Sequence, residues 1–131
     1  MEILDRIRRN WQNIEGIRER LDALTLLKSR AGYGSGRAGG ASDVVYKYAE
    51  KREQLRGSLV NYLESYVDDC LTCEPFFRKM DPRNAIILRG YYCAGMSAEE
   101  IGKRLRLDPS RVKHVKADAL AEFTGLLFVS K

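Results

Sequence analysis

The feature that most constrains the fold is a long stripe of apolar residues between positions 45 and 70. Its members recur at steps of three or four residues, with Arg52 as the one interruption: Val45, Tyr48, Leu55, Leu59, Tyr62, Tyr66 and Cys70. This is the spacing of heptad a and d positions, and it predicts one long amphipathic helix. From position 43 to about 71 such a helix would be roughly 40 Å long. It therefore has to pack along a second helix.

A similar pattern fills the N-terminal range 1–30. Its apolar residues are Leu4, Ile7, Trp11, Ile14, Leu21, Leu24 and Leu27. The range 31–42 that follows contains five glycines between positions 31 and 41, which predicts a flexible linker. Ser42 and Asp43 then offer N-cap oxygens for the long helix, which we place at 43–74. That helix pairs either with the first helix, as an antiparallel hairpin, or with a second subunit, as a coiled coil.

The last range, 75–131, carries three closely spaced signals for the start of a helix. Asp81-Pro82 and Asp108-Pro109 each combine an N-cap residue with proline at the first helical position. Between them, the run from Ser97 to Glu100 has the sequence of a capping box. No alternation typical of strands and no hairpin turn occurs. We therefore predict an all-α protein whose C-terminal part consists of three short helices.

The second and third of these helices, with the tight turn between them, have the layout of a DNA-binding helix-turn-helix. A shared core of Ile101, Leu105, Leu107, Val112 and Val115 is expected to fix the angle between them, and Gly102 to permit close approach. The residues expected to point outward near the start of the third helix, where a recognition helix reads the major groove, are Ser110, Arg111, Lys113, His114 and Ala117.

The positive charge of the chain gathers in the same place. The chain has 23 Lys and Arg against 18 Asp and Glu, a formal net charge of +5. Between positions 103 and 116 six basic residues face the single acid Asp108, so this stretch alone carries +5. The basic residues are Lys103, Arg104, Arg106, Arg111, Lys113 and Lys116. Binding to phosphates requires clustered cations, so this distribution favours double-stranded DNA as a partner. The competing interpretation is a solvated charged face on a helical corner that binds no DNA.

Residues 100–105 and 111–120 resemble the fourth conserved region of bacterial sigma factors, which recognises the promoter −35 element. The resemblance spans about positions 82–123. It implies that Ser110 and His114 contact bases, and that Arg111 and Lys113 are the basic residues that meet DNA. The same resemblance makes bacterial RNA polymerase a possible partner. The whole chain more loosely resembles small phage and prophage transcriptional regulators of the RinA and ArpU kind.

Three positions depart from the sigma pattern. Arg106 occupies the turn position where glycine is usual, which implies a positive φ or a different turn. Pro109 replaces a side chain that often donates to bases, and Asp118 stands where a basic residue is common. The chain also lacks a region resembling the sigma segment that melts DNA, so we expect an accessory regulator and not a complete sigma factor.

Several other functions are disfavoured. The chain has one histidine and no nucleophile beside it with an orienting acid, so we expect no enzyme. Residues 34–39 match a dinucleotide fingerprint but follow a helix instead of a strand, so we expect no cofactor. We expect Cys70 and Cys93 to be core residues and Cys73 to lie in a connection, without a metal site. No secretion signal or apolar run of membrane length is present, which predicts a cytoplasmic protein with no membrane partner.

The resulting hypothesis is a sequence-specific regulator of transcription with an N-terminal helical hairpin or coiled coil and a C-terminal sigma-like helix-turn-helix. The N-terminal helices are available for forming a homo-oligomer or for contacting the polymerase. The alternative is a DNA-packaging or architectural subunit, such as a small terminase, which also joins a helix-turn-helix to an oligomerising helical segment.

Overall fold

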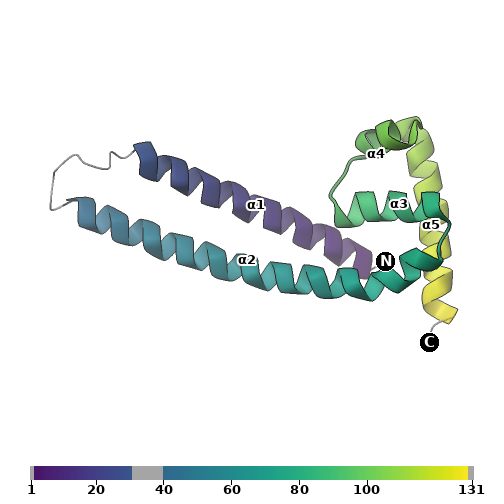
Figure 1. Cartoon of the computed structure of the whole chain (residues 1–131), viewed down its shortest axis with the longest axis horizontal. Coiled ribbons are helices and arrows are strands. Elements are labelled where there is room, and N and C mark those ends of the chain that lie inside the picture. Colours follow the sequence, from purple (N-terminus) through teal and green to yellow (C-terminus); the bar gives the residue numbers. More distant parts are fainter. Residues whose placement is uncertain (1, 31–39, 130–131) are drawn as a thin grey trace. The chain divides into compact units, whose positions relative to one another are not determined.

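The computed structural model describes residues 2–30 and 40–129, and all regular structure in these residues is helical (Figure 1). The helices are α1 (Glu2–Arg30), α2 (Gly40–Lys79), α3 (Pro82–Leu88), the π-helical segment η1 (Arg89–Cys93), α4 (Ala98–Leu105) and α5 (Pro109–Val129). The predicted all-α class is therefore confirmed. No helix in the described part of the chain is long and apolar enough to cross a membrane.

Two compact units make up the chain, and their limits differ from the ranges 1–30, 31–42, 43–74 and 75–131 expected from the sequence. The first unit, called the head here, joins Met1–Gln12 to Ser65–Lys131, and the second, called the hairpin, is Asn13–Glu64. The head thus includes the first turns of α1 and the last third of α2. Most of the expected linker, residues 31–39, lies outside the described residues.

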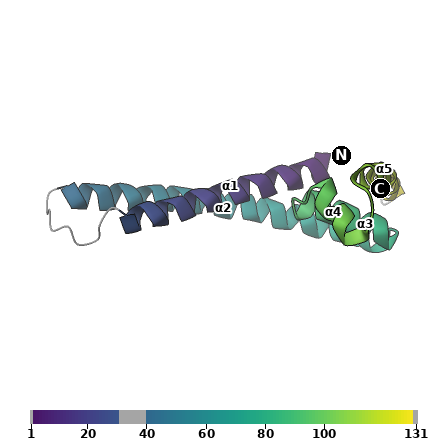
Figure 2. The same cartoon turned by 90° about the horizontal axis from the view of Figure 1, so that it is seen from above.

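In the hairpin, α1 and α2 run antiparallel (Figures 1 and 2). Leu24 and Leu27 of α1 line one groove together with Leu55 of α2, as the predicted pairing of the two stripes requires. Of the two arrangements that the sequence left open, the structure shows the intramolecular hairpin. The helix α2 begins at Gly40, ahead of the expected cap residues Ser42 and Asp43, whose side chains lie outside the described residues.

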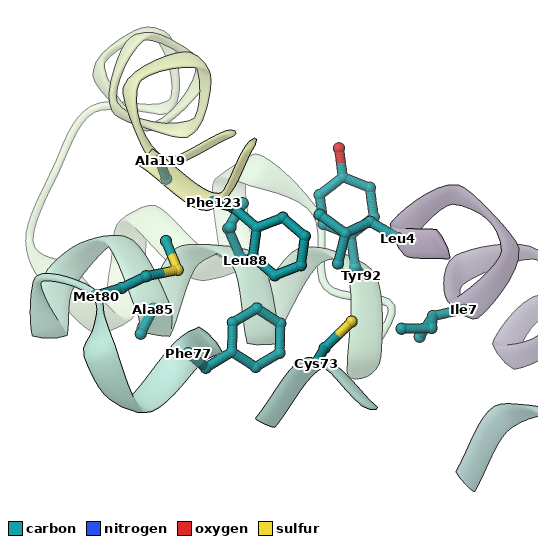
Figure 3. Packing of buried hydrophobic residues seen from close by; sticks show 10 residues of the cluster. All are labelled: Leu4, Ile7, Cys73, Phe77, Met80, Ala85, Leu88, Tyr92, Ala119 and Phe123. Atoms are coloured by element: carbon teal, nitrogen blue, oxygen red, sulfur yellow. The ribbon is translucent and has the colours of Figure 1, made fainter. Parts of the chain in front are cut away.

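The main core lies in the head and combines residues from α1, α2, α3, η1 and α5 (Figure 3). Its buried members are Leu4, Ile7, Cys73, Phe77, Met80, Ala85, Leu88, Tyr92, Ala119 and Phe123. The Phe77 and Phe123 rings lie 5.7 Å apart between centroids, and neither side chain is appreciably exposed. Arg6 of α1 forms a bidentate ion pair with Asp69 of α2. Its Nε and Nη2 donate to the carboxylate at 2.7 and 2.8 Å, which also holds α1 against α2 in this unit.

The C-terminal end of α2 corrects two expectations. The helix continues through Pro75 to Lys79, although proline removes one backbone donor and the sequence placed the helix end near position 74. Burial explains the continuation, because Cys73 and Phe77 on α2, and Met80 directly after its end, are at most 5% exposed. Cys73 is therefore a buried helical residue and does not lie in a connection. Cys70 and Cys93, expected in the core, are half-buried at its edge.

The helix that follows starts as predicted but ends differently. Asp81 caps α3, its Oδ1 accepting the backbone N–H of Arg83 at 3.0 Å. After Leu88 the chain widens into the π-helical turn η1 and reverses at Gly95, which has φ of +64°. A Cβ at Gly95 would lie 2.2 Å from Nε1 of Trp11, so glycine is required there by backbone conformation and by packing. Trp11 thereby fixes the position of the loop that leads into α4.

Candidate nucleic-acid interface

The helix α4 begins with the capping box predicted from the sequence. Ser97 Oγ accepts the Glu100 N–H at 3.2 Å, and the Glu100 carboxylate accepts the Ser97 N–H in return. Met96, just before the cap, packs with Ile101 in a small second core, which gives the start of α4 a hydrophobic staple as well. The direction in which α4 enters the motif is therefore fixed by local sequence.

The turn between α4 and α5 depends on Gly102 and Arg106. A Cβ at Gly102 would lie 2.5 Å from the carbonyl oxygen of Leu107, so the close approach expected of Gly102 is made mainly to the turn itself. Arg106 adopts the left-handed conformation, φ 57° and ψ 44°, and its N–H bonds the Gly102 oxygen. Of the two possibilities implied by an arginine at this position, the positive φ is the one observed. The Leu107 N–H also reaches the Gly102 oxygen, at 2.8 Å.

The core between the two helices forms as expected and has one member that was not predicted. Ile101, Val112 and Val115 are buried, and Leu105 and Leu107 pack against them partly exposed. Ile87 of α3 joins them and is fully buried. The local pattern of α4 and α5 could not reveal Ile87, because its partners are at least 14 positions further along the chain. Through it, the helix-turn-helix is attached to α3.

The outward face of α5 presents the residues predicted to meet DNA. Ser110, Arg111, Lys113, His114 and Ala117 are all exposed. By helical periodicity, Ser110, His114 and Ala117 share the side opposite to Val112, Val115 and Ala119, and Lys113 and Arg111 flank this side. The Ser110 hydroxyl donates to Asp108 Oδ2 at 2.7 Å, so its lone pairs remain as acceptors.

In the described part of the chain, the exposed cations around this face form no ion pairs with acids. Lys103, Arg104 and Arg106 on α4 and the turn are exposed, as are Arg111 and Lys113 on α5. Among the residues that the structure describes, none of these five forms an ion pair with a carboxylate. A cationic side chain without an acidic partner can bind an external anion. This surface therefore has the charge needed to bind phosphates.

Lys116 has a different environment from the other predicted DNA contacts. It is half-buried, and its Nζ lies 3.8 Å from the centre of the Tyr91 ring, a cation–π distance. The guanidinium of Arg8 lies at the same distance from that ring and donates from Nη1 to the Tyr91 carbonyl oxygen. No local pattern could predict this contact, because Arg8 and Tyr91 are 83 positions apart.

The cysteines lie away from this face. Burial raises the pKa of Cys73 to about 12, and a hydrogen bond with Cys93 lowers the pKa of Cys70 and raises that of Cys93. Within residues 2–30 and 40–129, no three His, Cys, Asp or Glu side chains are placed to hold a metal ion. His114 is exposed on α5.

Comparison of the chain with models of protein families, with curated proteins and with solved structures found no match.

Proposed function

We propose that this protein is a sequence-specific double-stranded DNA-binding regulator of transcription. The observation that carries the proposal is the outward face of α5, where exposed polar residues are surrounded by cations without acidic partners in the described part of the chain. Solvated charged faces are common, but this one surrounds the N-terminal half of the second helix of a helix-turn-helix, the part of such motifs that reads bases.

In the proposed complex, α5 lies in the major groove, which is about 12 Å wide and admits one helix. Ser110, His114 and Ala117 then face the base edges, and Lys113 and Arg111 approach the phosphates on either side. Arg106 contributes a phosphate contact from the turn. The exposed imidazole of His114 offers either a donor or an acceptor to a base, so we assign sequence preference to it before the others.

The step from DNA binding to transcription depends on the resemblance of residues 82–123 to the fourth region of sigma factors. We therefore propose bacterial RNA polymerase as the protein partner, a phage or prophage setting and a cytoplasmic location. Copurification of the polymerase with the full chain, and transcription from a selected promoter with and without it, test this step. Tight DNA binding without any effect on the polymerase contradicts the regulatory role and leaves the DNA-binding role standing.

The DNA-binding role is tested by selecting bound fragments from random duplexes and by titrating them over a range of salt concentrations. Lys113→Ala should weaken binding to all sequences and make the salt dependence shallower by about 0.9, the contribution of one phosphate. His114→Ala should change which sequence is preferred and leave the salt dependence nearly unchanged. Equal effects of the two substitutions would show that α5 faces DNA differently. Binding without salt dependence, or no binding, overturns the proposal.

We further propose that two copies associate through the hairpin. Within residues 13–64 that the structure describes, only Ile14 and Ile17 are buried apolar side chains, while Leu27, Val45 and Val60 are each about half exposed. A groove of about 520 Å³ lies between α1 and α2. The face is roughly two helices wide and 30 Å long, about 600 Å² in outline, which approaches the roughly 800 Å² that a stable partner buries. Basic Arg20 and Lys51 line the groove, and the same hairpin carries exposed acids such as Glu19 and Glu50 that a second copy can bring opposite them.

Self-association also fits the proposed DNA contact, because paired helix-turn-helix motifs read two half-sites. Sedimentation measurements should give a dimer for the wild-type chain and a monomer for Leu27→Glu combined with Leu55→Glu. Asp22→Asn serves as the control, because Asp22 is exposed on the side of α1 opposite to Leu24 and Leu27. A monomeric wild-type chain contradicts the dimer. A ring of eight or more subunits would instead favour the DNA-packaging subunit over the regulator.

A further inference from the structure

The Tyr91 ring is contacted by two cations that come from opposite ends of the chain. Arg8 Cζ and Lys116 Nζ each lie 3.8 Å from its centre, so the two charges are at most about 7.6 Å apart, twice that distance. Separations of this size are shorter than the Debye length of about 8 Å at physiological salt, so the two charges repel each other. Neither cation forms an ion pair with a carboxylate of the described residues.

The ring compensates for part of this repulsion, and the backbone carbonyl of Tyr91 takes one hydrogen bond from Arg8. Within residues 2–30 and 40–129, the remaining N–H groups of the guanidinium and the ammonium form no ion pair with a carboxylate. Both side chains are half-buried, so their positions are defined by packing and do not vary as those of a free surface lysine do. The result is a pair of oriented donors held on one aromatic ring.

The pair lies on the flank of α5 that faces a DNA strand in the proposed complex. Lys116 follows Lys113 by three positions and is therefore its neighbour on the helix surface, displaced from the base-reading side toward the core. A helix about 10 Å across in a groove about 12 Å wide brings its flanks next to the phosphates. Beyond Lys116, the next cation in this direction is Arg8, which belongs to α1.

We infer that Arg8, Tyr91 and Lys116 form an additional phosphate-binding site, through which the first helix of the chain takes part in binding double-stranded DNA. This inference rests on the proposed function and extends its interface from the helix-turn-helix to α1. Lys116 and Arg8 bind phosphate groups of one strand, and Tyr91 is a positioning residue that holds both cations without contacting DNA. The site carries no base-specific group, so it contributes affinity and orientation without sequence preference.

The test is the salt dependence of duplex binding by the full chain carrying Arg8→Met, which keeps much of the stem and removes the charge. We expect binding to weaken three- to tenfold at moderate salt, and the log–log slope to fall by about 0.9, the value for one phosphate. Arg9→Met is the matched control, since Arg9 is exposed on another side of the same helix and loses the same charge. It should leave the slope unchanged.

Variants of Tyr91 separate positioning from folding. Tyr91→Phe retains the ring and should bind like the wild type, whereas Tyr91→Leu removes the ring face and should lower the slope. A slope that is the same for Arg8→Met, Arg9→Met and the wild type overturns the inference, as does a fall in thermal stability of Arg8→Met without any change in slope. If Lys113→Ala still lowers the slope in that case, the proposed function stands. A wild-type chain that does not bind duplex DNA overturns both.

Discussion

The head and the hairpin are built from the same kind of amphipathic helix, yet they bury apolar side chains to very different extents. In the head, segments of α1, α2, α3, η1 and α5 meet around Phe123, so each apolar stripe is covered from several sides. In the hairpin, two helices meet along one line, and Leu26, Val45 and Val60 remain at least half exposed. The number of helices that converge, and not the strength of the apolar pattern, decides how much surface is removed from water.

In the proposed function, this difference separates two tasks. The head is held by its own core and presents α5 on a fixed support, as a DNA-reading element requires. The hairpin retains apolar surface that a second chain can cover, as an association element requires. Substitutions at corresponding positions in the two units therefore test whether the head and the hairpin differ in stability and in binding.

The largest effect is expected from Phe123→Ala in the head. The Phe123 side chain is fully buried against Phe76 and Phe77, so its truncation should destabilise the protein by about 3–5 kcal/mol. The matched change in the hairpin is Leu26→Ala, at a side chain that is 57% exposed, and it should cost no more than about 0.5 kcal/mol. Urea unfolding of both variants measures the difference. Similar losses at a protein concentration low enough to keep the chain monomeric would contradict the difference in burial between the two units.

A smaller effect is expected where a glycine of the head is replaced. Gly102→Ala places a Cβ 2.5 Å from the Leu107 carbonyl oxygen, and because that atom is backbone, the turn has to shift. We expect a loss of about 1–3 kcal/mol, as in overpacked sites, together with weaker duplex binding, because α5 moves with the turn. Denaturant unfolding and binding titration of the same sample check the two parts. Unchanged duplex binding in a destabilised variant would show that the turn does not determine the position of the DNA-binding surface.

Structural features that depend on a few neighbouring residues could be predicted from the sequence, whereas features that depend on distant segments could not. Signals that act over a few residues were read correctly, including the caps at Asp81 and Ser97 and the positive φ as one of two options at Arg106. The exposed face of α5 was also predicted, because helical periodicity fixes which residues share a side. The N-terminal pairing was left between two arrangements, since a heptad pattern does not specify its partner.

What the sequence did not predict are the contacts between distant segments. The helix expected to end at position 74 continues through Pro75 to Lys79, because Phe77 is buried in the core of the head. The π-helical turn at η1 has no local signature of its own. The Arg8 contact with Tyr91 joins residues 83 positions apart, and no pattern along the chain encodes such a pair. For the candidate interface, the side chains on α5 were thus predictable and their surroundings were not.

Arg106→Gly should change the stability of the head and its affinity for duplex DNA in opposite directions. The left-handed backbone costs a non-glycine residue roughly 1–2 kcal/mol, and glycine adopts it freely but loses more chain entropy on folding. We therefore expect a net gain of about 0.5–1 kcal/mol in the free energy of unfolding. The same substitution removes a cation from the turn, so duplex binding should weaken and its salt slope fall by about 0.9. Thermal unfolding and salt titration measure the two changes. A variant that is more stable and binds duplex DNA as tightly as the wild type would show that Arg106 does not contact DNA.

The smallest effect is expected from Gly57→Ala in the hairpin, and its sign should be opposite to that of Gly102→Ala. Gly57 lies in the interior of α2, and a Cβ there meets nothing within 4 Å. Alanine is preferred to glycine inside a helix by about 0.5–1 kcal/mol because it restricts the unfolded chain, so the variant should be more stable by up to that amount. Unfolding experiments at several protein concentrations test this in the monomer and in any dimer. Because the added methyl group has open space in the single chain, a destabilisation that appears only at high concentration would place Gly57 at the contact between two hairpins.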